Sequence, residues 1–402
     1  MCNFKNWPII SALKRTEKTV KSLIAKYSYL FNNEVMATKI GIIGFGGFGQ
    51  FIYESCKQLK HIEVSAIADN KKSCDPGHTK FYTAWKGLIR DENVDLVWIA
   101  TVPDVHAGIA CAAMYAGKDV IIEKPAATNM KDAKQILNVR DKTARIATVN
   151  YMMRFNPISI CLQQFNDKNI FGKIRRVHIE NYAQDETLPL KHWFWNKEVS
   201  GGILIEHAVH FFDLVNYISG QKQIKVNGLC YRRQSGQEDQ VFAGVLYDKG
   251  LIASHYHSFS RPGFFERTSI RLSFDLAEID IEGWLPLKGH FRALINKNTA
   301  SEIRKLPNVE MKEQKIASIL KKQGNTEIAM LRSGGIKYNV DKMVEGTFEI
   351  IEDKQQVYGV CVRALLSDVI AKREKPSHKM RVNLEDGITS LEIATLASKS
   401  CR

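Results

Sequence analysis

Near its beginning the chain reads Lys39-Ile40-Gly41-Ile42-Ile43-Gly44-Phe45-Gly46-Gly47-Phe48-Gly49, a short apolar run that ends in glycines. Residues 39–44 have the pattern of a buried strand, and a segment compatible with a helix follows through Leu59. The glycines have the spacing G-x-G-x-x-G. The first permits a tight turn, the second lets a pyrophosphate approach the backbone, and the third allows the helix to pack closely on the strand. Because a structural glycine turn can show the same letters, the motif needs support from its surroundings.

An acidic residue supplies that support. Asp69 follows Gly49 by twenty positions and comes directly after the next expected strand, 64–68. A carboxylate in this place accepts hydrogen bonds from a ribose diol, so strand, loop, helix, strand and acid together predict a dinucleotide site with its phosphates at the helix N-terminus. Asp69 would repel a 2′-phosphate, which favours NAD. Lys71 and Lys72 follow at once and could neutralise such a phosphate, which leaves NADP open.

Strands and helices alternate after this motif up to about residue 156. The further expected strands are 96–100 and 119–122, and the expected helices include 106–116 and 130–139. Short apolar strands separated by helices predict a parallel sheet covered on both faces. We therefore expect a dinucleotide-binding domain over residues 38–156.

After Pro157 the pattern changes to longer β-rich segments joined by short polar turns. These segments are 174–183, 224–233, 241–247, 251–259 and 267–281. Sequential hairpins predict an antiparallel sheet, and hence an α+β domain over residues 157–402. The charged stretch 288–345 is expected to cover or extend that sheet, and two helices, 357–372 and 384–400, are expected to close the chain.

Residues 1–37 do not behave like the rest. They carry six lysines and arginines against Glu17 and Glu34, with apolar residues loosely at helical spacing, and Met36 precedes the first strand. One interpretation is an N-terminal extension, or an upstream start codon with Met36 as the true start. The other is an amphipathic targeting segment, which Glu17 weakens.

The composition of the 402 residues excludes several protein classes. With 45% hydrophobic residues the chain is globular, and it shows neither a secretory signal nor the apolar run of about 18 residues that a membrane span needs.

The eight cysteines are spread out without a C-x-x-C motif, so we expect reduced thiols, no structural metal and a cytoplasmic location. The net charge of +14 comes from lysines and arginines scattered among acids, so we expect neither nucleic-acid nor membrane partners, although a basic surface also suits an anionic small substrate.

Several motifs in the same order resemble the Gfo/Idh/MocA family of NAD(P)-dependent oxidoreductases. They are Gly44 to Gly49, Thr101-Val102-Pro103-Asp104-Val105-His106, Ala116-Gly117-Lys118-Asp119-Val120-Ile121-Ile122-Glu123-Lys124-Pro125, Arg154-Phe155-Asn156-Pro157, and Gly201-Gly202-Ile203-Leu204-Ile205-Glu206-His207-Ala208-Val209-His210-Phe211-Phe212-Asp213. The resemblance covers residues 38 to about 283 and the closing helix. It implies a Rossmann domain followed by a domain with a large open, mainly antiparallel sheet. It also implies an oligomer, a homodimer or homotetramer, built through that sheet.

The resemblance also implies the site residues. Lys124 is expected beside the nicotinamide, with a hydrogen bond to the reacting hydroxyl, and His210 is expected as the acid/base. The expected cofactor-binding residues are Gly44, Phe45, Gly46, Gly47, Phe48, Gly49, Asp69, Thr101, Pro103, His106, Glu123 and Lys124. The expected substrate-binding residues are Lys124, Arg154, Trp193, Glu206 and His210.

General chemistry supports these roles. Oxidising an alcohol by hydride transfer requires a base near pH 7, for which histidine is the natural residue. A helix from about Gly202 would place Glu206, His210 and Asp213 on one face, where the carboxylate of Glu206 can orient the imidazole. The family has Asp where this chain has Glu206, so its contact with the substrate is less certain than its support of His210.

Other aromatic and histidine side chains leave alternatives open. His207 and Asp213 are expected to be structural or to act through a neighbour. Trp193 and Trp195 can stack on a sugar or belong to the core. His255 and His257 share a strand face, but two histidines without a third ligand do not predict a metal site.

The predicted function is hydride transfer between nicotinamide and a hydroxyl or carbonyl carbon of a sugar, sugar acid or cyclitol. Two alternatives remain: an NAD-dependent glycosidase that recycles its cofactor, and a non-catalytic sensor of dinucleotide and sugar.

Overall fold

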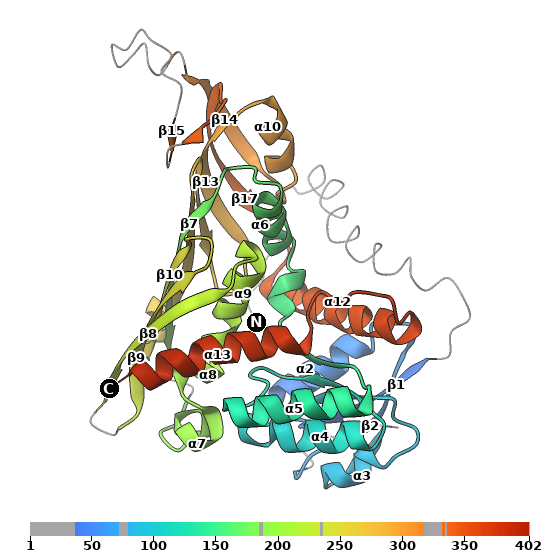
Figure 1. Ribbon diagram of the computed structural model, residues 1–402. Coiled ribbons are helices and arrows are strands. Elements are labelled where there is room, and N and C mark those ends of the chain that lie inside the picture. Colours follow the sequence, from blue (N-terminus) through green and yellow to red (C-terminus); the bar gives the residue numbers. More distant parts are fainter. Residues whose placement is uncertain are drawn as a thin grey trace, which may run out of the picture.

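A computed structural model describes residues 37–401, apart from 72–78, 185–187, 234–235, 317, 319–331 and 334–335. Two large sheets lie next to each other, and two C-terminal helices run between them (Figure 1). Residues 1–36 lie outside the described residues, so an N-terminal extension or targeting segment stays a prediction.

The first sheet has six parallel strands in the order β3-β2-β1-β4-β5-β6. The strands are β1 (Thr38–Ile43), β2 (Ile62–Ala68), β3 (Lys80–Tyr82), β4 (Leu96–Ile99), β5 (Asp119–Ile122) and β6 (Ala147–Val149). Both faces are covered, so all residues of β4 and β5 are buried and the strands read as apolar runs. The expected parallel sheet is confirmed. Sequence analysis did not predict the two edge strands β3 and β6, because a strand of three residues is too short to show a hydrophobic period.

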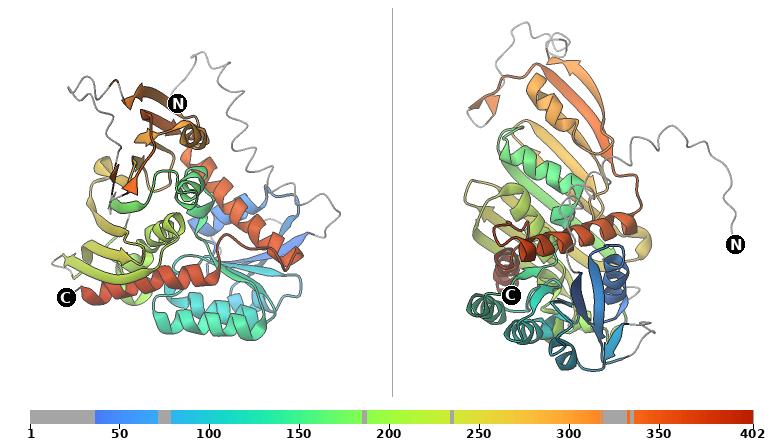
Figure 2. Two further views of the ribbon diagram at one scale, coloured as in Figure 1. Left: turned by 45° about the horizontal axis from the view of Figure 1, so that its top comes forward. Right: turned by 90° about the vertical axis from the view of Figure 1, so that its right-hand side faces the viewer.

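Four helices and two short 3-10 turns accompany this sheet and cover both of its faces (Figure 2). They are α2 (Gly47–Cys56), α3 (Trp85–Ile89), η1 (Pro103–Val105), α4 (His106–Tyr115), α5 (Met130–Thr143) and η2 (Met152–Phe155). The side chain of Asn129 caps α5 by accepting a hydrogen bond from the Asp132 amide at 3.0 Å. Helices α4 and α5 pack side by side.

The carboxyl ends of the parallel strands meet at one edge of the sheet. Gly44 follows β1, Asp69 follows β2, Thr101 comes two residues after β4, and Glu123 follows β5. Because the strand order reverses between β1 and β4, a crevice opens at this edge, where α/β proteins of this topology bind ligands.

The second sheet has nine strands in the order β14-β17-β13-β12-β11-β7-β10-β9-β8. The strands are β7 (Ile174–Gln184), β8 (Gln223–Arg232), β9 (Glu238–Tyr247), β10 (Ile252–Arg261), β11 (Arg267–Phe274), β12 (Ala277–Glu282), β13 (Lys288–Ile295), β14 (Glu310–Lys315) and β17 (Lys342–Glu349). All neighbours are antiparallel except β7 and β10, so the mainly antiparallel sheet is confirmed.

Two expectations about this sheet are refined by the structure. The stretch 288–345 extends the sheet, through β13, β14 and the start of β17. The expected single segment 267–281 is a hairpin that turns at Asp275, whose carboxylate accepts hydrogen bonds from the Lys173 amide at 2.8 Å and from Arg175 at 2.7 Å. Strands β15 (Arg332–Ser333) and β16 (Ile336–Lys337) form a separate two-stranded sheet.

Helices cover one face of the second sheet. The helices of this part are α6 (Pro157–Asp167), α7 (Lys197–Ser200), α8 (Ile203–Glu206), α9 (Val209–Ser219) and α10 (Lys297–Ile303). Two 3-10 turns accompany them, η3 (Trp193–Trp195) and η4 (Gly263–Phe265). Helix α9 packs on β7 and against α6. The other face exposes alternate side chains, among them Leu229, which is 68% exposed, and Ile252, which is 57% exposed. Among the described helices, none combines the length and the apolar character that crossing a bilayer requires.

The last two helices, α12 (Lys354–Glu374) and α13 (Leu384–Ser400), confirm the expected closing pair. Helix α12 packs on α2, where the ring centroid of Tyr358 lies 4.9 Å from that of Phe51. Helix α13 contacts β6 of the first sheet as well as β8 and β9 of the second. Because these helices touch both parts, the division into 38–156 and 157–402 stays a prediction.

The contact between α13 and β8 gives a test of the fold. A Cβ at Gly228 would lie 2.1 Å from the carbonyl oxygen of Ala397, a backbone atom that cannot move cheaply. We expect Gly228→Ala to lower the free energy of unfolding by about 1–3 kcal/mol. The control is Gly108→Ala in α4, where a Cβ would have no neighbour within 4 Å. Because alanine has the higher helix propensity, this variant should raise the free energy of unfolding by at most about 1 kcal/mol. Urea unfolding followed by circular dichroism measures both, and equal midpoints would contradict the packing.

Candidate functional site

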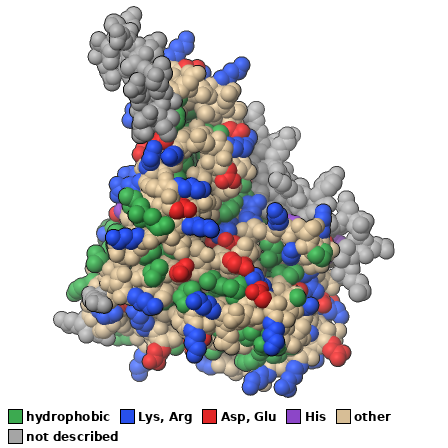
Figure 3. Space-filling view, in the orientation of Figure 1, with side chains coloured by type: hydrophobic (Ala, Val, Ile, Leu, Met, Phe, Trp, Pro, Cys, Tyr) green, Lys and Arg blue, Asp and Glu red, His purple; other side chains and the backbone are tan. Residues whose placement is uncertain are grey.

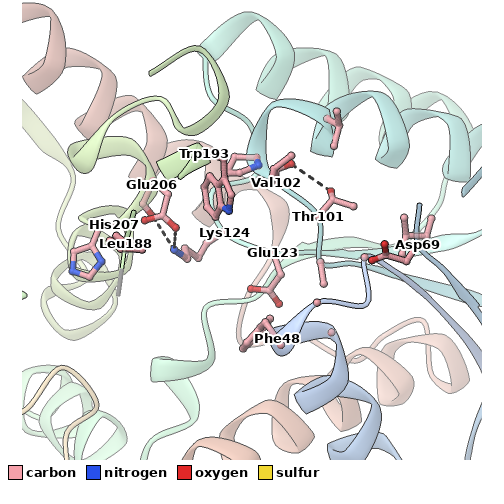
Figure 4. A pocket seen from close by; sticks show the side chains of 18 of the residues that line it. Phe48, Asp69, Thr101, Val102, Glu123, Lys124, Leu188, Trp193, Glu206 and His207 are labelled. Carbon is pink, nitrogen blue, oxygen red and sulfur yellow. Dashed lines mark hydrogen bonds and ion pairs between the residues drawn. The ribbon is translucent and has the colours of Figure 1, made fainter. Parts of the chain in front are cut away.

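A cavity of about 980 Å³ lies at the carboxyl edge of the first sheet. Its other walls come from β7, from the α8–α9 region and from single residues of β10 and α12. Figure 4 shows Asp69 at one end, Glu206 and His207 at the other, and Lys124 and Glu123 between them. The cavity therefore brings the expected cofactor-binding and catalytic residues together.

The glycine loop has the geometry that its spacing predicts. Gly44 has φ +92°, and a Cβ there would lie 2.4 Å from the carbonyl oxygen of Ala100. A Cβ at Gly49 would lie 2.0 Å from the carbonyl oxygen of Gly44, so the start of α2 packs directly on the turn. A Cβ at Gly46 or Gly47 would have no described atom within 4 Å. This open space leaves room for a pyrophosphate at the N-terminus of α2.

Asp69 is held at the end of β2 by two backbone amides. Its Oδ2 accepts a hydrogen bond from the Phe45 amide at 2.6 Å, and its Oδ1 accepts one from the Lys71 amide at 2.8 Å. The carboxylate thus lies beside the glycine loop, where a ribose diol would bind. Lys72, which left NADP open, lies outside the described residues.

Two residues expected to bind the cofactor do not line the cavity. The side chain of Phe45 is buried against Tyr53, and its amide donates to Asp69. His106 is fully buried, with Nδ1 2.8 Å from the Pro125 oxygen and Nε2 3.1 Å from the Thr101 oxygen. Both side chains therefore shape the loops of the cavity. Among the other expected cofactor residues, Gly44, Gly46, Gly47, Phe48, Gly49, Asp69, Thr101, Pro103, Glu123 and Lys124 line it.

Glu123 is a buried carboxyl group at the end of β5. Its Oε1 accepts hydrogen bonds from the Trp98 indole at 2.9 Å and from the Asn150 amide at 2.8 Å. Burial raises the pKa of Glu123 to about 7. Trp98 and Asn150 were missed by sequence analysis, because Trp98 lies on β4 and Asn150 directly follows β6, and only the sheet brings them to Glu123.

Lys124 precedes Pro125 through a cis peptide bond. Its Nζ donates to Oε1 of Glu206 at 2.5 Å and to the Glu206 carbonyl oxygen at 2.9 Å. A lysine ammonium carries three N–H donors, so one remains for a substrate oxygen. The pair joins the first sheet to α8, and its atoms lie inside the cavity (Figure 4).

The expected support of His210 by Glu206 is wrong. Helix α8 ends at Glu206 and α9 begins at Val209, so the two side chains do not share one continuous helix face. The carboxylate of Glu206 contacts Lys124 instead, and the buried Nδ1 of His210 has no hydrogen-bond partner among the described residues. His210 does line the cavity, and burial, Lys124 and His207 hold its pKa well below its ordinary 6.5. Its imidazole is therefore uncharged at neutral pH.

The expected contact of Arg154 with a substrate is also not seen. Arg154 does not line the cavity and is buried, with Nη2 2.7 Å from Oδ1 of Asp213 and 3.0 Å from Oδ1 of Asp386. It thus links η2 to α9 and α13. Asp213 has the structural role expected of it, as the carboxylate of this buried pair.

His207 lines the cavity, although it was expected to be structural or to act through a neighbour. Its Nε2 lies 2.8 Å from Oδ1 of Asn181, and the Asn181 amide donates to Thr268 at 2.6 Å. Asn181 lines the cavity too. The signal for Asn181 was its place on the buried face of β7, in alternation with Val177 and Ile179.

The two tryptophans and the histidine pair are now placed. Trp193 lines the cavity, whereas Trp195 packs on Phe194 and Phe259. His255 and His257 are buried, and their four ring nitrogens have no hydrogen-bond partner among the described residues. No three His, Cys, Asp or Glu side chains in the described residues gather as a metal site requires.

Several further residues line the cavity that sequence analysis did not single out. They come from strands, loops and a helix far apart in the chain: Gln184, Leu188, Phe259, Glu266, Trp284 and Tyr358. Only the packing of both sheets and α12 brings them together, so no local motif could have found them.

Comparison with known proteins identifies two matched regions. Residues 38–151 match the GFO/IDH/MocA model described as an oxidoreductase family with an NAD-binding Rossmann fold, and residues 162–275 match the GFO/IDH/MocA C-terminal domain. Together the two regions cover more than half of the chain.

Individual relatives are distant. The chain is 27% identical over 190 residues to a myo-inositol 2-dehydrogenase from Thermotoga maritima, covering 46% of this chain and 55% of that protein. It is 31% identical over 142 residues to a levoglucosan dehydrogenase from Pseudarthrobacter phenanthrenivorans, covering 34% and 36%. The chain spans between 36% and 61% of the length of the first curated relatives that it matches.

A solved structure shares the fold across nearly the whole chain. The WlbA dehydrogenase from Bordetella pertussis, in complex with NADH and UDP-GlcNAcA, superposes with a TM-score of 0.70. The alignment covers 91% of this chain and 96% of that one at 17% identity.

The buried ion pair of Arg154 gives a stability prediction. Arg154→Met leaves the Asp213 carboxylate buried without its partner, so we expect the free energy of unfolding to fall by about 3–5 kcal/mol. The control is Arg292→Met, whose pair with Glu345 is more than half exposed on both sides and should change stability by about 1 kcal/mol or less. Urea unfolding compares the two. Equal losses would show that Arg154 has no structural role.

The buried histidines predict a loss of stability in acid. Burial lowers the pKa of His207 to about 3, and it lowers those of His210, His255 and His257 well below 6.5. Below pH 6.5 the unfolded chain binds protons that the folded chain does not. As the pH is lowered below 6.5, the free energy of unfolding therefore decreases by up to about 1.4 kcal/mol per pH unit for each such histidine. For His207 this decrease continues down to about pH 3.

The double variant His255→Phe/His257→Phe tests this effect. We expect a smaller difference in unfolding free energy between pH 7.5 and pH 5 than in the unmodified protein. The values at pH 7.5, where these histidines are neutral in both states, serve as the internal control for altered packing. An undiminished pH dependence in the variant would refute the assignment.

Proposed function

Because the chain belongs to the GFO/IDH/MocA oxidoreductase family, we propose that it is an NAD(P)-dependent dehydrogenase or reductase. The reaction is hydride transfer between nicotinamide and a hydroxyl or carbonyl carbon of a sugar, sugar acid or cyclitol. The names of the relatives, an inositol dehydrogenase and a levoglucosan dehydrogenase among them, support this substrate class.

The observation that carries the proposal is the Lys124–Glu206 pair in the cavity that also holds the glycine loop. Lys124 lies between the end of the cavity with Asp69, where the dinucleotide fits, and the end with Glu206 and His207, where a substrate has room. Its remaining N–H donor binds the reacting oxygen, while Glu206 fixes the ammonium in place. Lys124, His210 and Glu206 are therefore proposed as the catalytic group, with Glu206 acting through Lys124.

His210 is proposed as the acid/base. The supporting observation is that His210 lines the cavity and is uncharged at neutral pH, the form from which it would take the hydroxyl proton, while burial disfavours the imidazolium and so weakens it as a base. When bound, the dinucleotide supplies the hydride acceptor or donor. The carboxylate of Asp69 beside the glycine loop supports NAD over NADP.

The remaining proposals concern partners and location. In Figure 3 the lysines and arginines are scattered among acids, which supports a small-molecule enzyme over a nucleic-acid-binding protein. We place the protein in the cytoplasm. The uncovered face of the nine-stranded sheet supports assembly into a homodimer or homotetramer.

The proposal is tested by titrating the purified protein with NADH and NADPH and then screening sugars, sugar acids and inositols for turnover. We expect Lys124→Met to lower kcat at least 100-fold, because the reacting oxygen loses its donor, while dinucleotide affinity changes little. Lys134→Met, an exposed lysine of α5, is the control and should keep full activity.

Three outcomes separate the alternatives. Turnover lost in Lys124→Met alone supports the dehydrogenase. Tight dinucleotide binding without net turnover of any substrate favours the cofactor-recycling glycosidase or the sensor. Failure to bind either dinucleotide would refute the proposed function.

A further inference from the structure

The substrate end of the cavity carries an unusual balance of charge for a protein of net charge +14. Among the described residues that line the cavity, Lys124 is the only lysine or arginine. The acids are Asp69 at the dinucleotide end, Glu123 at the centre and Glu206 at the substrate end. The fourth is Glu266, which directly precedes Arg267, and Arg267 pairs with Tyr182 between the lining residues Asn181 and Ala183 of β7. Among the described lining residues, the acids therefore outnumber the basic residues by four to one.

The charge of Lys124 is already balanced. Its Nζ lies 2.5 Å from the Glu206 carboxylate, and both side chains are mostly shielded from solvent, at 17% and 11% exposure. An anionic group on a substrate would have to compete with Glu206 for this ammonium. The pair offers a hydrogen bond to an uncharged oxygen, and it carries no net charge to attract a second anion.

Arginines of the neighbouring strands are engaged elsewhere. Arg233 donates to the Phe259 carbonyl oxygen at 2.6 Å and to Asp239 at 3.3 Å. Arg261 stacks on the Tyr182 ring, 4.0 Å from its centroid, and Arg267 pairs with Glu180 at 3.2 Å. None of the three lines the cavity, so the usual bidentate recognition of carboxylate or phosphate by arginine is not built among the described residues.

The remaining lining suits hydroxyl groups and the apolar faces of a ring. Trp193 and Phe259 supply aromatic surface, on which the C–H face of a sugar or cyclitol packs. His207 and His210 are uncharged at neutral pH because they are buried, so they act as hydrogen-bonding groups there. Glu266, which is exposed at the start of β11, adds a negative charge to this end.

We propose that the site takes an uncharged polyhydroxylated substrate and discriminates against carboxylated or phosphorylated ones, with Glu266 as one determinant of that choice. The inference rests on the proposed function and narrows it. It separates this chain from relatives whose ligand is an anionic nucleotide sugar, such as the UDP-GlcNAcA of the Bordetella pertussis enzyme.

The experiment compares kcat/KM for substrates that share a carbon skeleton and differ in charge: D-glucose with D-glucuronate, and myo-inositol with an inositol monophosphate. We expect the uncharged member of each pair to be preferred at least tenfold. The preference should narrow as salt is raised, because screening weakens repulsion between like charges. Where neither member is turned over, calorimetric binding to the dinucleotide-loaded protein replaces kcat/KM.

Two variants test the role of Glu266. Glu266→Gln should raise the relative kcat/KM of the charged member about threefold, and Glu266→Lys should raise it further. Glu282→Lys makes the same charge change at a residue of β12 that is 57% exposed and outside the cavity, and it should leave the ratio unchanged. This control removes the effect of overall charge.

The outcomes separate the inference from the function on which it rests. Equal or better use of the charged member by an active enzyme overturns the inference and leaves the dehydrogenase in place. An unchanged ratio in Glu266→Lys overturns the role of Glu266. Failure to bind any dinucleotide overturns the proposed function itself.

Discussion

The ion pair between Lys124 and Glu206 is the interaction on which the site depends. Lys124 comes from the end of β5 in the first sheet, and Glu206 from the end of α8 beside the second. Their contact fixes Lys124 between the dinucleotide end and the substrate end of the cavity. Because Glu206 holds the ammonium through both its carboxylate and its carbonyl oxygen, little freedom is left for that side chain.

A second, buried pair supports this arrangement from outside the cavity. Arg154 contacts Asp213 of α9 and Asp386 of α13, so η2, the helix that carries His210 and the last helix are tied together. Helix α12 contributes Tyr358 both to the packing on α2 and to the cavity wall. The position of the site is thus set by contacts between residues that are 59 or more positions apart in the chain.

The longer side chain at position 206 fits this geometry. Sequence analysis assigned Glu206 to the support of His210, since a continuous helix would have aligned the two. The break between α8 and α9 removes that alignment, and the carboxylate reaches Lys124. His210 is left with an unpartnered, buried Nδ1 among the described residues, and burial rather than a carboxylate sets its protonation state.

Local features of the sequence determined the glycine loop, the strand ends with Asp69, Thr101 and Glu123, and the change after Pro157 from alternating strands and helices to longer strands joined by turns. These depend on backbone sterics and on hydrophobic periodicity, which act between near neighbours. The tertiary structure alone decided which carboxylate meets Lys124, that Arg154 is structural, and that Lys124 is the only lysine or arginine among the described residues that line the cavity. Such contacts join side chains from separate elements, so their distances follow from how the sheets and helices pack and from no local pattern in the chain.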